Sequence, residues 1–125
     1  MQNSFIDLVI RIKNGYMARK ESIEASYARF NEEILGKLKQ LGFIKNFKTK
    51  DRKIQIELLY VDRNPAITDV QIFSKPGMRF YVSYKDLKPV LGGLGYSIIS
   101  TSKGILSNKE ARKRKLGGEL LFSIW

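Results

Sequence analysis

Hydrophobic residues at the start of the chain recur every three or four positions, which is the spacing of one face of an α-helix. One such stripe spans residues 5–16, and a second spans residues 30–41 and stops just before Gly42, a residue type that commonly ends helices. Ser26 is the expected N-terminal cap of the second helix. The chain is therefore predicted to open with two amphipathic helices.

After Gly42 the hydrophobic period changes to two, the period of a β-strand. The expected strands are residues 43–47, 54–60 and 67–73. Together with the two helices they predict an α-α-β-β-β lobe over residues 1–73, closed by one antiparallel sheet.

Ser74-Lys75-Pro76-Gly77 is a turn sequence, and we expect a lobe boundary there. Beyond it the pattern predicts strands at 78–82, 96–100 and 119–125, and helices at 84–91 and 108–115. Ser107 and Glu110 match a capping box at the start of the last helix. The predicted fold class is α+β with two small lobes, the second being a mixed β-sheet with short helices over residues 74–125.

Composition excludes several kinds of chemistry. The 125 residues include no Cys and no His, so the chain cannot form a disulfide, a thiolate or imidazole metal site, or a Ser-His-Asp triad. Aspartates stand singly, and neither a dinucleotide fingerprint nor a phosphate-binding loop is present. We therefore predict a protein that is not an enzyme, with no cofactor and no metal. No apolar run approaches the roughly 20 residues that cross a bilayer.

Charge indicates the kind of partner. The chain has 23 Lys and Arg against 12 Asp and Glu, a net charge of +11, which favours a polyanion such as nucleic acid. The segment 74–125 carries ten basic and three acidic residues, whereas 1–73 carries thirteen and nine. The C-terminal lobe is thus the more basic part.

A run of hydroxyl side chains follows the predicted strand 96–100. The Ser-Thr-Ser loop comprises Ser100, Thr101, Ser102, Lys103 and Gly104. Hydroxyls both donate and accept hydrogen bonds, a cation neutralises phosphate, and glycine lets a backbone come close, so the loop suits RNA recognition. A solvated connection between a strand and a helix is an equally good interpretation of the same residues.

Other candidates for RNA contact are cations and an aromatic residue outside the loop. Arg112 and Lys113 belong to four consecutive cations, some of which could instead favour the helix C-terminus through its dipole. Arg79 and Tyr81 share one strand face, from which Tyr81 could stack on a base or enter the core. Further candidates, for which a solvated surface is the alternative, are Arg11, Lys13 and Asn14 on the first helix.

Several segments that contain these candidate residues resemble the bacterial-type small-subunit ribosomal protein eight family. The segments that carry the resemblance are Ser74-Lys75-Pro76-Gly77-Met78-Arg79-Phe80-Tyr81, Leu91-Gly92-Gly93-Leu94-Gly95, Ile98-Ile99-Ser100-Thr101-Ser102-Lys103-Gly104, Lys109-Glu110-Ala111-Arg112 and Gly117-Gly118-Glu119-Leu120 with Trp125. They stand in the order and at the spacing of that family, and the first helix is similar in weaker form.

The resemblance implies a structural role in the small ribosomal subunit. It implies that the C-terminal lobe binds the central domain of small-subunit rRNA, that Ser100, Thr101 and Ser102 recognise that RNA with Lys103 on its backbone, and that Glu119 accepts a hydrogen bond from a base. Lys75, in the first of these segments, is a further candidate for RNA binding. The resemblance also implies that small-subunit protein five is a neighbour and that the chain takes part in subunit assembly. An alternative is a regulatory protein that represses its own ribosomal-protein mRNA. The expected location is the ribosome of a bacterial cytoplasm, or of a mitochondrial matrix or plastid stroma.

Overall fold

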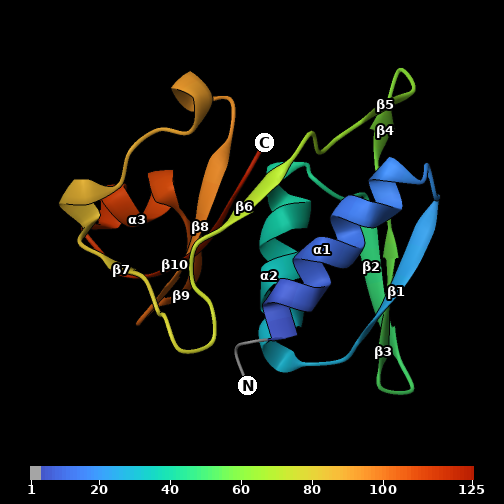
Figure 1. Cartoon of the computed structure of the whole chain (residues 1–125), viewed down its shortest axis with the longest axis horizontal. Coiled ribbons are helices and arrows are strands. Elements are labelled where there is room, and N and C mark those ends of the chain that lie inside the picture. The colour runs from blue at the N-terminus through green and yellow to red at the C-terminus, as the bar shows by residue number, and fades with distance from the viewer. Residues whose placement is uncertain (1–3) are drawn as a thin grey trace. The chain divides into compact units, whose positions relative to one another are not determined.

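The computed structural model describes residues 4–125. Contacts divide the chain into two units, of which unit 1 ends at Thr68 and unit 2 begins at Asp69 (Figure 1). Residues 1–3 of the predicted N-terminal lobe lie outside the described residues. The lobe boundary predicted from the sequence lies slightly later, after residue 73.

Unit 1 has two helices over one face of a three-stranded sheet (Figure 1). Its elements are α1 (Ser4–Met17), β1 (Ser22–Ser26), α2 (Arg29–Leu41), β2 (Asn46–Lys50), β3 (Lys53–Glu57), β4 (Tyr60–Val61) and β5 (Asn64–Pro65). The strand order is β1-β3-β2, with both pairings antiparallel. The two predicted helices and their hydrophobic faces are confirmed, and Gly42 ends α2 with φ 86°.

The third strand of this sheet was predicted wrongly. It is β1, between the helices, whereas residues 70–72 of the predicted strand 67–73 form β6 and pair with the last strand of unit 2. Only Ala25 of β1 is buried, so the sequence alternation that marks a strand is faint there. Ser26 consequently ends β1, and the N-cap of α2 is Ala28, without a side-chain hydrogen bond.

Tyr16 links α1 to the segment before β2 and to the segment after β3. Its buried hydroxyl donates to the carbonyl oxygen of Phe43 at 2.6 Å and accepts from the backbone N–H of Leu59 at 2.9 Å. Burial raises the pKa of the Tyr16 phenol above its usual value, chiefly because the ionised form would lose solvation. Two backbone groups far apart in sequence thus depend on one side chain for their hydrogen bonds.

Unit 2 is built on its last strand. Its elements are β6 (Val70–Ile72), β7 (Tyr81–Val82), two 3-10 turns, η1 (Tyr84–Asp86) and η2 (Leu91–Gly93), β8 (Tyr96–Thr101), β9 (Gly104–Ser107), α3 (Asn108–Arg114) and β10 (Gly118–Ile124). The order is β6-β10-β8-β9, and β7 also pairs with β10. Every pairing among the described strands is antiparallel, so the expectation of a mixed sheet is corrected.

The core of unit 2 lies between this sheet and α3. Ile99, Leu106 and Leu120 from three neighbouring strands form one buried cluster with Ala111 of α3 and Leu87. The predicted capping box is confirmed, because Ser107 accepts from the N–H of Glu110 and Glu110 accepts from that of Ser107. The helix predicted at 84–91 is instead the two short turns η1 and η2.

Within residues 4–125, no helix combines the length and the apolarity required to span a membrane.

Replacing Tyr16 by Phe should lower the free energy of unfolding by about 1–3 kcal/mol, because two backbone groups lose their buried partner. Urea denaturation measures the change. The Tyr60 hydroxyl donates to the exposed carbonyl of Lys20 at 2.7 Å, so Tyr60→Phe is the control and should cost less than about 1 kcal/mol.

The same substitution has a pH signature. The stabilising effect of the Tyr16 hydroxyl is complete below the usual phenol pKa of 10.0 and declines as the pH rises above it, because the unfolded chain ionises first. The difference between the wild type and Tyr16→Phe should therefore shrink in alkaline buffer. A constant difference across that range would contradict the bridging role of the protonated hydroxyl.

Candidate nucleic-acid interface

The Ser-Thr-Ser loop is the turn of a β-hairpin. Residues of β8 and β9 pair up to Thr101 opposite Gly104, which leaves Ser102 and Lys103 as the two turn residues. Gly104 has φ 105°, a backbone conformation that glycine adopts without strain. The alternative of a direct connection from strand to helix is thus corrected, since β9 lies between the loop and α3.

The three hydroxyls of this loop have different environments. The Thr101 hydroxyl donates to the carbonyl of Gly104 at 2.8 Å and accepts from the N–H of Lys103 at 3.1 Å, so it holds the turn together. The half-buried Ser100 and the exposed Ser102 have no side-chain hydrogen bond to any described residue. Ser100 and Ser102 therefore keep both donor and acceptor capacity for a ligand.

Strand pairing places three of the predicted residues in one row. Glu119 of β10 is directly opposite Tyr81 of β7 on one side and Ser100 of β8 on the other. Directly paired residues project from the same face of a sheet. The binding row, defined here as Tyr81, Glu119 and Ser100, thus combines an aromatic ring that is 70% exposed, a buried carboxylate and a hydroxyl.

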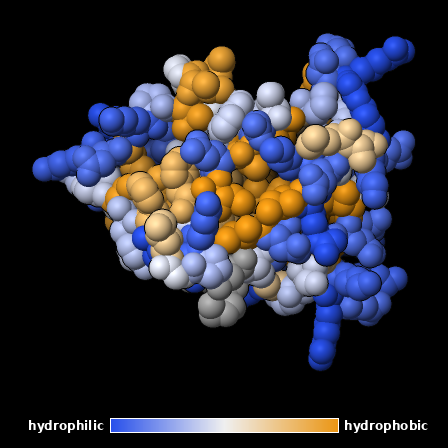
Figure 2. Space-filling model, viewed as in Figure 1, coloured by the Kyte–Doolittle hydropathy of each residue, from blue (hydrophilic) through white to orange (hydrophobic). Residues whose placement is uncertain are grey.

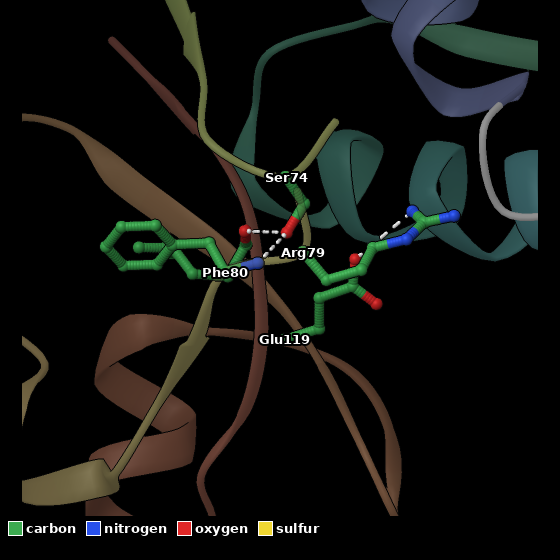
Figure 3. A network of polar contacts seen from close by, with 5 residues as sticks. Ser74, Arg79, Phe80 and Glu119 are labelled. Atoms are coloured by element: carbon green, nitrogen blue, oxygen red, sulfur yellow. Dashed lines mark hydrogen bonds and ion pairs between the residues drawn. The ribbon is translucent and has the colours of Figure 1, made fainter. Parts of the chain in front are cut away.

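Arg79 adds a cation to the binding row. Its guanidinium lies 3.4 Å from the carboxylate of Glu119, and the two side chains are 26% and 8% exposed (Figure 3). The pair neutralises Glu119 and fixes the direction of the guanidinium. A carboxylate held this way has little surface left for a base, whereas Arg79 still reaches solvent.

A buried serine fixes the segment that carries Arg79 and Tyr81. Ser74, fully buried, donates through its hydroxyl to the carbonyl of Leu120 at 2.8 Å and accepts from the N–H of Phe80 at 3.0 Å (Figure 3). Phe80 also accepts through its carbonyl from the N–H of Leu120 at 2.8 Å. The intervening turn closes where Lys75 and Met78 bridge, with Gly77 at φ 79° and the cation of Lys75 exposed.

Two glycines allow the strands of the row to approach one another. A Cβ on Gly118 would overlap with the carbonyl oxygen of Ser100, and one on Gly117 would collide with the backbone of Val82. A larger residue at either position would push β10 away from β8 or β7. In the sequence these glycines are identified only within a segment that carries the family resemblance, and their contacts with the row were not predicted.

The basic run at the end of α3 divides by its contacts. Arg112 donates to the carbonyl of Leu87 at 3.1 Å, which anchors η1 to the helix. Lys113 and its two successors are exposed, and their side chains have no partner among the described residues. Lys113 is thus free for phosphate, whereas Arg112 has a structural bond as well.

The candidates on α1 belong to unit 1. Arg11 forms an ion pair with Asp7 at 2.8 Å, so part of its charge is compensated. Asn14 is exposed, and together with Arg11 it lines an open hollow that also includes Lys20 and Glu24. Lys13 is half-buried on the same helix. In the described residues no group of three or more acidic side chains could hold a metal ion.

Comparisons with known proteins agree on one family. The family model described as ribosomal protein S8 matches residues 3–125. The chain is 44% identical to small ribosomal subunit protein uS8c of Tupiella akineta over 124 residues, with 95% of each chain covered. It is 41% identical to uS8 of Dictyoglomus thermophilum, covering 95% of this chain and 94% of that protein, and 43% identical to uS8 of Acholeplasma laidlawii, covering 100% and 98%.

The substitution Ser74→Ala should destabilise the chain by about 1–3 kcal/mol, because it leaves a buried carbonyl and an N–H without their partner. Ser102→Ala is the matched control, since its exposed hydroxyl has no protein partner, and it should change the free energy of unfolding by less than about 0.5 kcal/mol. Equal effects of the two substitutions in chemical denaturation would show that Ser74 does not hold this segment.

Proposed function

The chain belongs to the ribosomal protein S8 family, and on this premise we propose that it is a structural constituent of the small ribosomal subunit that binds the central domain of small-subunit rRNA. The family consists of structural proteins without enzymatic activity, and the chain is not an enzyme. Its proposed work is to hold one conformation of an irregular RNA helix and so to help the subunit assemble.

The observation that supports this proposal most strongly is that two serine hydroxyls, one in the binding row and one in the adjacent hairpin turn, have no hydrogen-bond partner among the described residues. Ser100 and Ser102 have hydroxyls without a partner among the described residues, and Tyr81 presents an exposed ring in the same row as Ser100, with Glu119 between them. Hydroxyls can bond base edges and the 2′-hydroxyl of RNA, and an exposed ring can stack on an unpaired base. Specificity is thus proposed to come from these three residues.

Cations around the row supply affinity in this proposal. Lys103 is in the hairpin turn, and Lys75 is in the turn that follows the buried Ser74. Lys113 is exposed on α3, and Arg79 is oriented by Glu119. Phosphate contacts of this kind position a protein on RNA without reading its sequence. Gly104 keeps the backbone of the turn accessible, and Thr101 supports the turn itself.

Glu119 is proposed to position Arg79 and only secondarily to accept from a base, because its carboxylate is almost buried against the guanidinium. Arg11, Lys13 and Asn14 are proposed as weaker contacts made by unit 1. Small-subunit protein five is a proposed neighbour, and the bacterial cytoplasm, mitochondrial matrix and plastid stroma are the proposed compartments.

Repression of its own ribosomal-protein mRNA is a second proposed role. It would use the same hairpin, because an mRNA fold that displays the same bases would meet the same hydroxyls. Crosslinking in cells, followed by sequencing of the bound RNA, separates the two roles: rRNA alone supports the structural role, and an additional ribosomal-protein mRNA supports both.

Removing the two unpartnered hydroxyls should abolish recognition without abolishing binding. In a titration against a transcript of the central-domain helix and against a scrambled hairpin, Ser100→Ala with Ser102→Ala should lose about 1–3 kcal/mol per broken contact on the cognate RNA only. Lys103→Ala should instead weaken binding to both RNAs and lower the salt dependence by roughly 0.7–0.9 of a unit.

Ser26→Ala, an exposed serine on β1, is the matched control and should leave both titrations unchanged. If the wild type binds the two RNAs equally well, the proposed recognition of central-domain rRNA is wrong. If the wild type discriminates and the double variant discriminates as well, the function stands and the assignment of Ser100 and Ser102 is wrong.

A further inference from the structure

The sheet of unit 1 has one face that neither of its helices covers (Figure 1). Every second residue of β1, β2 and β3 projects from it, beginning with Ser22, Asn46 and Lys53, and all nine are exposed. The residues between them, such as Ile54 and Ile56, are buried on the other face. None of the nine is apolar, and Figure 2 shows hydrophilic side chains over β1 and β3. We call this surface the open face.

The lysines of the open face gather at the end next to the turn between β2 and β3. Lys50 lies directly opposite Lys53, and Lys48 precedes Lys50 by two residues on the edge strand β2. Strand residues two positions apart are separated by roughly 7 Å. Like charges directly opposite one another in a sheet repel and lower its stability. Three ammonium groups thus share a small area at a cost to the fold.

Acidic side chains compensate these lysines only in part. Lys53 lies 3.8 Å from Glu24, its neighbour on β1. The side chains of Lys48 and Lys50 have no hydrogen bond or ion pair with any described residue. Asp51, in the turn, likewise forms no ion pair within residues 4–125. Lys48 and Lys50 therefore keep all their donors for a ligand.

An open hollow runs across this face. It is lined by Glu24, Lys48, Lys50, Asp51, Lys53 and Gln55. Gln55 is paired with Lys48 on one side and with Glu24 on the other, so its amide stands in the middle of the surface. A neighbouring hollow shares Glu24 and Lys53 with the first and reaches Arg11 of α1. Cations and an amide thus line one continuous, shallow surface.

The chemistry of the open face matches the backbone of double-helical RNA. The minor groove of an A-form helix is wide and shallow, and it displays 2′-hydroxyls next to the phosphates. Lysine neutralises phosphate, and an amide can hydrogen-bond to a hydroxyl. Recognition of unpaired bases uses aromatic rings, and a protein interface has an apolar core. The nine side chains of the open face provide neither.

We propose that the open face of unit 1 binds the sugar-phosphate backbone of a double-helical segment of small-subunit rRNA through Lys48 and Lys50. The inference rests on the proposed function for the identity of the RNA, and neither lysine belongs to the residues proposed above. Unit 2 then recognises particular bases, and unit 1 adds affinity that does not depend on sequence. Phosphate beside Lys50 and Lys53 relieves their mutual repulsion.

Lysine acetylation tests the inference on the wild-type chain. The chain, free or bound to complete small-subunit rRNA, is treated briefly with an acetylating reagent, and mass spectrometry measures the modification of each lysine. We expect the RNA to slow acetylation of Lys48 and Lys50 several-fold. Lys37 on α2 and Lys45 before β2 are the matched controls, because they line neither hollow, and their acetylation should stay the same.

Lys103 in the hairpin turn separates the two claims within this experiment. Protection of Lys103 without protection of Lys48 and Lys50 would overturn the site on the open face and leave the proposed function intact. Protection of Lys48 and Lys50 without that of Lys103 would support the open face and overturn the hairpin as the recognition site. Equal protection of the two control lysines would overturn the site on the open face, because RNA would then coat the chain without preference.

Two double variants provide a second measurement. Lys48→Gln with Lys50→Gln removes about two phosphate contacts, so the salt dependence of binding to complete small-subunit rRNA should fall by roughly 1.4–1.8 units. The control, Lys37→Gln with Lys45→Gln, removes the same charge and should keep the salt dependence of the wild type. An equal decrease in both double variants would contradict the site, because net charge alone would explain it.

Urea denaturation separates lost binding from lost folding in these variants. Lys50→Gln removes the repulsion with Lys53, so the midpoint of the open-face double variant should equal or exceed that of the wild type. A lower midpoint would contradict the repulsion between the two lysines, and with it the site.

Discussion

The pairing of Glu119 with Tyr81 and Ser100 determines the arrangement of the candidate site. β10 is the strand to which β6, β7 and β8 are all hydrogen-bonded, so a change in its position would displace the aromatic ring, the guanidinium and the hairpin together. Gly118 makes this possible, because any side chain there would overlap with the Ser100 carbonyl. The proposed recognition surface thus depends on close backbone packing between β10 and its neighbouring strands.

Hydroxyl side chains near the candidate site have different roles. The Thr101 hydroxyl stabilises the hairpin turn, and the Ser74 hydroxyl joins β10 to the segment before β7. Ser100 and Ser102 are left with unused hydrogen-bonding capacity. In the proposed complex with RNA, a pre-formed turn would lower the entropic cost of ordering these groups, which is the general advantage of a preorganised binding site.

The sequence predicted the helices of unit 1 and the capping box of α3 correctly, because both depend on local spacing. It missed β1, whose Ala25 is its only buried residue, and it assigned residues 67–73 to the wrong sheet. Local periodicity does not determine which strands distant in sequence pair with each other. For the same reason the sequence identified the residues of the site one by one, and only the structure shows that Tyr81, Glu119 and Ser100 form one row across β7, β10 and β8.

We propose that RNA contacts unit 2 at the hairpin and the binding row. NMR tests this contact through the amide chemical shifts of the labelled chain during titration with the central-domain transcript. The largest shifts are expected at residues 100–104, 79–81 and 119, with small shifts at 91–94. Shifts concentrated in the η2 loop, or spread evenly over the basic surface of both units, would contradict it.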